Sequence, residues 1–255
     1  MKTFYRFTPV AFLIAMIFSS CIYTEEITFG KDGSGTISFK VDMSSIMEAQ
    51  MEMEQKKDSA IRKKNYRKTD SIFYFSDYLD SMKDSIARLD EAEKRKLEML
   101  RPFKAHAYLD EEHGKGFFEV IFDFDAVTEL NDIHERMQLA STINLKNNNT
   151  TSGVFHPGYS LKYILSGRKF HRKVIIDKLT AGQRAEIDRN NRESLKFQSG
   201  SPYIFKYHFP KTIKSVSYPG AEISEDGKTL IINTVLDSVV LHPEKFDFTV
   251  KFHRK

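Results

Sequence analysis

The stretch Ile27–Val41, which reads ITFGKDGSGTISFKV, decides the fold of this chain. Three glycines lie between residues 30 and 35, and glycine permits the positive φ angles that a tight turn requires. After them, Ile37, Phe39 and Val41 alternate with polar residues, which gives a strand with one buried face. The stretch therefore predicts a β-hairpin and, with it, an antiparallel sheet.

The same alternation of apolar and polar residues recurs along the rest of the chain. Its most regular example is Tyr203–Phe209, in which every second residue is aromatic. Asp226-Gly227 is a strong hairpin signal between two later runs. The further expected strands span 103–109, 116–124, 161–165, 170–176, 203–209, 213–218, 222–224, 230–236 and 246–252.

Apolar residues spaced by three and four predict helices between these strands. Ser44 offers an N-cap for the first helix, and Thr180 with Gln183 forms a capping box for the last. The run over 72–100 predicts an amphipathic helix or helix pair that ends before Pro102. The expected helices span 44–57, 72–100, 126–140 and 180–195.

The N-terminus has the layout of a bacterial secretory signal peptide. Lys2 and Arg6 precede the apolar run Val10–Phe18, which is shorter than the about 20 residues of a membrane-spanning helix. The following Ser-Ser-Cys21 resembles a lipobox, so we expect a signal peptide over 1–20, lipid on Cys21 and a tether over 21–26. The alternatives are an ordinary cleaved secretory signal and an uncleaved anchor.

The residues after Cys21 bear on the location of the protein. Ile22 stands where an aspartate would resemble an inner-membrane retention signal, which favours the outer membrane. Glu25-Glu26 resembles the surface-export signal of Bacteroidetes-type lipoproteins, although two solvated glutamates in a tether are the plainer interpretation. The periplasmic face and the cell surface both stay open.

These elements predict an α+β protein, with antiparallel hairpins and meanders and with amphipathic helices packed on one side. A β-hairpin and helix region is expected over 27–140 and a β-rich region over 160–255. The polar residues 141–159 form a loop between them. The two regions are either separate or parts of one continuous domain.

Composition excludes several classes of protein. The formal net charge is +4, and removal of the leader takes Lys2 and Arg6 with it. A charge so close to neutral is not that of a nucleic-acid-binding protein, so we expect no nucleic-acid partner. The single cysteine excludes a disulfide within the chain. Stability must come from packing, for which 21 phenylalanines and 11 tyrosines supply large side chains.

Two segments carry a resemblance to known families. These are the opening FGKDGSGTISFKVDMSSIME after Cys21 and the stretch Phe205–Asp247 with its Pro219-Gly220 and Asp226-Gly227-Lys228 turns. Together they resemble uncharacterised Bacteroidetes-type outer-membrane lipoproteins and, more distantly, the lipoprotein domain family typified by mycobacterial LppM. The second resemblance implies an α+β domain able to hold a lipid-like ligand. Neither resemblance supplies a functional residue.

The sequence shows no motif for catalysis, for a metal or for a cofactor. It contains no HExxH, no GxSxG and no P-loop. We therefore expect no enzyme activity, no metal and no cofactor. Three histidines, one in each of three expected strands, would converge if those strands were neighbours: His106, His171 and His208.

An Asp-Ser pair followed by a small or aliphatic residue occurs five times. The pattern resembles the O-glycosylation sequon of periplasmic and surface Bacteroidetes proteins. The alternative is that Asp-Ser pairs are common at helix caps and on polar faces. The candidate modified residues are Ser59, Ser71, Ser81, Ser85 and Ser238.

These observations rank three functions. The first is a lipid-anchored, non-catalytic cell-envelope protein with a structural or partner-docking role. The alternative is a carrier of lipid or of another apolar ligand, because the alternating phenylalanines would line a cavity; a hydrolase of envelope polymers is a remote alternative. A closed apolar cavity of several hundred Å³ would favour the carrier, and an exposed apolar patch would favour docking.

Overall fold

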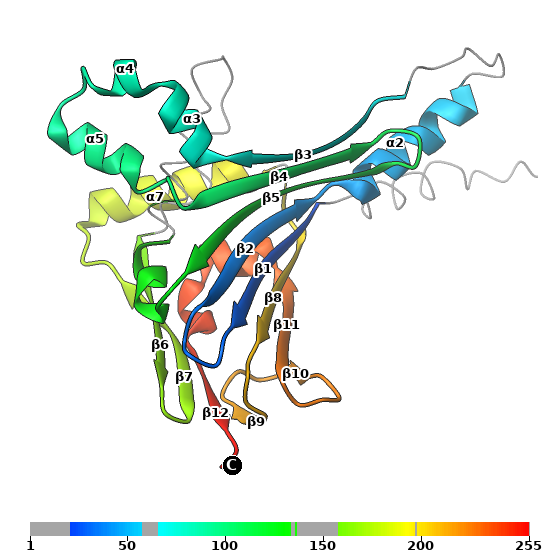
Figure 1. The fold of residues 1–255 in the computed structure, drawn as a ribbon. Coiled ribbons are helices and arrows are strands. Elements are labelled where there is room, and N and C mark those ends of the chain that lie inside the picture. The colour runs from blue at the N-terminus through cyan, green and yellow to red at the C-terminus, as the bar shows by residue number, and fades with distance from the viewer. Residues whose placement is uncertain (1–20, 58–65, 134–135, 137–157, 197, 255) are drawn as a thin grey trace, which may run out of the picture.

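Figure 1 shows the fold in a computed structural model of the chain, which describes residues 21–57, 66–133, 136, 158–196 and 198–254. All strands and core residues named below lie between residues 22 and 252. The expected signal peptide, Ser59 and residues 141–157 of the expected loop lie outside the described residues.

The larger layer is an eight-stranded sheet with the order β10-β11-β8-β1-β2-β5-β4-β3. The hairpin expected around the first glycine turn is confirmed, since β1 and β2 pair in antiparallel register from Ile22 opposite Asp42 to Phe29 opposite Gly35. The β1–β8 pair is parallel, whereas the other pairs of this sheet are antiparallel. The strands are β1 (Ile22–Phe29), β2 (Gly35–Asp42), β3 (Lys68–Tyr74), β4 (Phe103–Asp110), β5 (Lys115–Phe124), β8 (Pro202–His208), β10 (Glu222–Ile223) and β11 (Thr229–Val235).

The second layer is a four-stranded antiparallel sheet with the order β6-β7-β12-β9. Its β6–β7 hairpin turns through two residues, Gly167 and Arg168, and Gly167 has a φ of 55°. The strands are β6 (Tyr159–Ser166), β7 (Lys169–Ile176), β9 (Ile213–Val216) and β12 (Phe248–Phe252).

Helices connect and cap these sheets, so the α+β class is confirmed. The expected first and last helices are present, and Thr180 accepts a hydrogen bond from Gln183 N at 3.3 Å in the capping box of α7. The helices are α2 (Ser44–Lys57), α3 (Phe75–Ser81), α4 (Lys83–Ile86), α5 (Glu91–Glu98), α7 (Ala181–Leu195) and α8 (Leu236–Leu241), with 3₁₀ turns η2 (Val127–Asp132) and η4 (Pro243–Phe246).

The tether expected over 21–26 is wrong, because β1 begins at Ile22. Tyr23 and Glu25 turn inward along this strand, and Thr24 and Glu26 turn to the other face. The polar sequence suggested a solvated segment, but β2 and β8 pair with it on both sides. Residues 22–26 are therefore part of the larger sheet.

The segment expected as a helix over 72–100 begins as a strand. β3 pairs with β4 along its whole length, from Lys68 opposite Asp110 to Tyr74 opposite Lys104. Isoleucine, phenylalanine and tyrosine at 72–74 favour a strand, which here overrides the helical spacing. The helical pattern takes over at Phe75, which packs against Phe103 with ring centroids 6.4 Å apart, and it continues as three short helices.

Two other boundaries differ from the sequence-based expectations. The strand expected over 230–236 ends at Val235, and α8 follows with its apolar side chains in the core. The helix expected over 126–140 begins as the 3₁₀ turn η2, and most of its second half lies outside the described residues.

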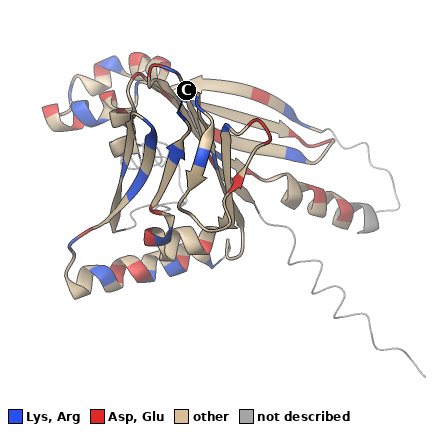
Figure 2. Ribbon diagram, turned by 90° about the horizontal axis from the view of Figure 1, so that it is seen from below, with Lys and Arg blue, Asp and Glu red and all other residues tan. Residues whose placement is uncertain are grey.

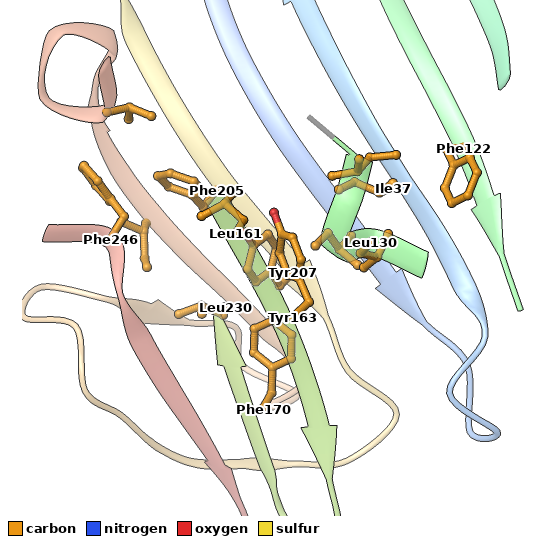
Figure 3. Close-up of a cluster of buried hydrophobic side chains, with 14 of the residues drawn as sticks. Ile37, Phe122, Leu130, Leu161, Tyr163, Phe170, Phe205, Tyr207, Leu230 and Phe246 are labelled. Atoms are coloured by element: carbon orange, nitrogen blue, oxygen red, sulfur yellow. The ribbon is translucent and has the colours of Figure 1, made fainter. Parts of the chain in front are cut away.

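The hydrophobic core lies between the two sheets (Figure 3). Phe170 of the smaller sheet meets Tyr207 of the larger one with ring centroids 5.7 Å apart. Leu130 of η2 and Leu236 of α8 belong to the same buried cluster. The second sheet thus supplies a cover for the first that the sequence pattern does not predict.

Candidate functional site

Cys21 lies at the start of the first strand of the larger sheet. It is half-buried and directly precedes β1, opposite the end of β2. Burial, together with the nearby Asp42 carboxylate, raises the pKa of its thiol. A thiol with a raised pKa is a poor nucleophile at neutral pH, so this position does not suit thiolate catalysis. The acylation of Cys21 stays a prediction.

Behind Cys21, Glu25 is completely buried, with 0% of the residue exposed. Its carboxylate accepts hydrogen bonds from the hydroxyls of Tyr163 at 3.1 Å and Tyr203 at 3.3 Å. The hydroxyl of Tyr207 donates a third hydrogen bond to Oε1. Burial first, and the Glu25 charge second, raise the pKa of each of these tyrosines well above its usual value.

Arg172 completes this buried cluster from the opposite sheet and is only 2% exposed. Its Nε lies 3.6 Å from Glu25 Oε1, and its Nη1 donates to the Phe246 carbonyl at 3.1 Å. The guanidinium carbon lies 5.0 Å from the centre of the Phe205 ring. Burial acts to lower the pKa of Arg172, but Glu25 and the tyrosines outweigh it and hold that pKa well above its usual value.

The Glu25 cluster joins the two sheets by charge and hydrogen bonds. Glu25, Tyr203 and Tyr207 come from the larger sheet, and Tyr163 and Arg172 from the smaller one. A buried polar network of this kind fixes one arrangement of its elements, since any shift would leave a charge unpaired. Its buried groups serve to hold the layers in register.

The three histidines whose strands would have had to be neighbours lie apart in the fold. His106 contacts Asp70 Oδ1, His171 contacts Asp247 Oδ1 and His208 contacts Glu26 Oε1, each at 2.7 Å. β5, β2 and β1 separate the strands of His106 and His208, and His171 belongs to the other sheet. Within the described ranges, no three His, Cys, Asp or Glu residues form a group that would hold a metal ion.

Four of the five candidate modification sites are described. Ser71 and Ser85 are exposed, and Ser81 is exposed with its hydroxyl donating to the Tyr78 carbonyl at 2.7 Å. Ser238 is half-buried in α8. Their modification stays a prediction.

The side chains of the phenylalanine-rich strands pack on aromatic rings of neighbouring elements. Phe205 packs on Phe246 with ring centroids 5.2 Å apart, and Phe209 packs on Phe252 at 4.9 Å. The alternation that suggested a carrier is thus accounted for by the packing of the core.

The outermost strand of the larger sheet carries large exposed apolar side chains. We call these residues the β3 surface: Ile72 is 54% exposed, Phe73 43%, Tyr74 48% and, from β5, Phe118 41%. Phe73 and Phe118 lie on the inner face of the sheet, whereas Ile72 and Tyr74 lie on the outer face. Ile72, Phe73 and Tyr74 were expected in an amphipathic helix and Phe118 in a strand, so the sequence pattern did not predict this surface.

Strand β3 is held in place by polar contacts with β4 and with the residue that follows β4. Lys68 pairs with Asp110 at 2.9 Å and His106 with Asp70 at 2.7 Å, while Arg67 pairs with Glu111 at 2.7 Å just before the strand. Among the described strands, β4 alone pairs with β3. The other edge of β3 therefore presents backbone N–H and C=O groups that no described strand uses.

Comparisons with known proteins do not assign this chain to a family. No family model and no curated protein matches the chain. The NMR structure of the folded domain of Mycobacterium tuberculosis LppM matches over 86% of this chain and 85% of that chain, at 9% identity and a TM-score of 0.37. The predicted resemblance to an LppM-like domain thus has a distant structural counterpart, and the Bacteroidetes-type resemblance stays a prediction.

No helix within the described residues has the length and apolar character needed to cross a membrane.

Proposed function

We propose that this protein is a lipid-anchored, non-catalytic protein of the cell envelope that docks a partner protein along the edge of β3. The observation that carries the docking role is the β3 surface, where three consecutive large apolar residues on an outermost strand are about half exposed. The signal-peptide layout and Cys21 support the anchor, and Ile22 after the cysteine supports the outer membrane.

The partner contributes an extended strand with apolar side chains. An exposed apolar edge strand is a template for strand addition, and proteins usually protect such edges with charges, proline or a cover. Here the charged residues of the strand, Lys68 and Asp70, are already engaged by Asp110 and His106. Main-chain hydrogen bonds would supply affinity, and Ile72 and Tyr74 would contact the partner's side chains on the outer face.

The docking edge lies on the same side of the molecule as the anchor. At the Cys21 end of β1 the residues run in register across the sheet, from Tyr23 through Val41, Phe118 and Ala107 to Ser71 of β3. Neighbouring strands are about 4.8 Å apart, so β3 lies roughly 20 Å from β1. A partner on this edge would therefore sit close to the membrane that holds the lipid.

The anchor is tested by Cys21→Ser in the native host, with metabolic labelling by a fatty acid and membrane fractionation. We expect loss of the label and release from the membrane. Ser20→Ala keeps a small residue before the cysteine and should retain both. Equal labelling of the Cys21→Ser variant would contradict the anchor.

The docking edge is tested with a photo-crosslinking residue at position 72, and with one at the exposed Lys83 of α4 as control. We expect an adduct of one defined mass at position 72 alone, which is lost when Phe73→Lys adds a charge beside the edge. An adduct of twice the chain mass would replace the partner with a second copy of this chain. Equal crosslinking from both positions would contradict docking at β3.

A further inference from the structure

A second surface, at the other end of the molecule, gathers positive charge in an open pocket of about 670 Å³. Figure 2 views the molecule from below, where blue Lys and Arg segments lie on the strands around the C-terminus. We call this hollow the basic pocket, and its lining consists of Arg168, Lys169, Lys214, Lys251, Phe252, His253 and Arg254.

Hydrogen bonds fix the backbone that carries the basic side chains of the pocket. Arg168 is the tip of the two-residue β6–β7 turn, and its carbonyl accepts a hydrogen bond from Phe252 N at 3.0 Å. His253 N donates to the Thr212 carbonyl at 3.0 Å on the other side. The end of β12 is thereby fixed between that turn and the start of β9.

Two of these lysines face each other directly. Lys169 of β7 lies opposite Lys251 of β12 on the outer face of the smaller sheet. On the same face, Lys162 of β6 lies opposite Lys173 of β7. Like charges directly opposite each other destabilise a sheet, so these two pairs act against folding unless an anion neutralises them.

In the larger sheet, by contrast, three of the lysines have a carboxylate partner. Lys40, Lys104 and Lys206 each lie within 4 Å of a carboxylate. In the described part of the chain, no carboxylate lies at ion-pair distance from the lysines and arginines of the basic pocket. The basic pocket therefore gathers several cations that no described carboxylate neutralises.

The basic pocket lies far from the anchor. Phe29, at the end of β1, packs on Phe209 with ring centroids 5.2 Å apart, and Phe209 packs on Phe252 of the pocket at 4.9 Å. Cys21 is at the beginning of β1, and a strand of this length spans roughly 25 Å. If Cys21 carries the lipid, the pocket points away from the anchoring membrane.

We propose that the basic pocket binds a phosphate-bearing ligand. Several ammonium and guanidinium groups around one hollow provide the charge-assisted hydrogen bonds that phosphate oxygens accept. A volume of about 670 Å³ is that of a small-molecule site. The same chemistry serves a free phosphorylated solute or the headgroup of a phospholipid, and the experiment below separates these sources.

The test uses residues 21–255 with Cys21→Ser, which contain both sheets and the whole described core, titrated calorimetrically with inorganic pyrophosphate. We expect saturable binding that weakens as salt is raised. Lys169→Glu should weaken it by about tenfold or more, since the variant removes one cation and ties up Lys251. Lys83→Glu makes the same change in net charge on α4, and it should bind as the unmodified chain does.

Lys169→Glu also separates lost binding from lost folding. The new carboxylate lies opposite Lys251, so repulsion becomes attraction, and we expect a melting temperature equal to or above that of the unmodified chain. A lower melting temperature would contradict the like-charge argument on which the proposal rests.

A second titration uses a short-chain phosphatidylglycerol, dissolved as monomers. Tighter binding of this lipid than of pyrophosphate, with the same loss in Lys169→Glu, would assign the pocket to a headgroup. Tighter binding of pyrophosphate would assign it to a free phosphorylated solute. Absence of saturable binding for both probes, or equal losses in Lys169→Glu and Lys83→Glu, would overturn the proposal.

Discussion

Glu25 and Arg172 meet in the interior between the two sheets, with Oε1 and Nε 3.6 Å apart, and each sheet contributes one of them. The pair is shielded from water on all sides, since the two residues are 0% and 2% exposed. Within such a pair, removal of one partner leaves the other as an uncompensated buried charge.

Glu25→Gln should therefore lower the free energy of unfolding by about 3–5 kcal/mol. Glu26→Gln is the matched control on the next residue, where the half-exposed carboxylate lies 3.1 Å from Lys206 Nζ, and it should cost less than about 1 kcal/mol. Urea denaturation of the two variants checks this. The double variant Glu25→Gln with Arg172→Met should lose less than the sum of the single losses, and additive losses would show that the two side chains are not coupled.

The buried tyrosines make the protein sensitive to alkali. The pKa of Tyr159 is raised to about 12, chiefly by burial, and the pKa values of Tyr163, Tyr203 and Tyr207 are raised well above their usual value, also chiefly by burial. Because an unfolded tyrosine titrates near pH 10, the unfolded chain releases these protons first, and stability falls as pH rises above about 10.

An alkaline titration followed by tyrosinate absorbance and circular dichroism tests this prediction. We expect the four buried hydroxyls to ionise only as the circular dichroism signal of the fold is lost. Ionisation of all 11 tyrosines in a chain that is still folded would contradict it.

Acid should loosen the β3–β4 edge. Hydrogen bonds from Lys68 first and from His113 second hold the pKa of Asp110 well below its usual value. A depressed carboxyl pKa stabilises the fold above the unfolded value of about 3.9, and that contribution is lost as pH falls below it. Hydrogen exchange along β3 should therefore accelerate below about pH 4, and Asp110→Asn should exchange quickly at neutral pH as well. Slow exchange in that variant would mean that Asp110 does not hold the edge.

Two glycine substitutions should move stability in opposite directions. A Cβ on Gly35 would collide with the Thr28 carbonyl and would lie 2.5 Å from Phe124 Cζ, so Gly35→Ala should be destabilising. Gly182 lies in α7 with open space around it, and Gly182→Ala should add up to about 1 kcal/mol through helix propensity. Thermal denaturation of both variants makes the comparison, and a stabilised Gly35→Ala would contradict the close approach of β2 to β1.

The sequence predicted the features of the fold that depend on residues close together in the chain. The turn at Gly33, the capping box at Thr180 and the alternation of Tyr203–Phe209 each specify one element, and all three are confirmed. The strand at 68–74 was missed because its apolar residues also fit a helical spacing. There, pairing with β4 decided the structure.

The candidate sites depend on partners that are distant in sequence. Glu25 suggested a solvated tether because its partners, Tyr163, Arg172 and Tyr203, belong to other parts of the chain. Lys169 and Lys251 are unremarkable until the register of β7 and β12 places them opposite each other. Such pairings follow from topology, which local patterns do not contain.

The parallel pairing of β1 with β8 has a consequence for how the chain acquires its structure. Glu25 and Tyr203, which hydrogen-bond across these strands, are 178 residues apart in the sequence. Contacts of such separation make folding slow, because a long loop must close before they form. The junction of β1 with β8 in the larger sheet cannot form until β8 has been synthesised, so the larger sheet is completed only late in the synthesis of the chain.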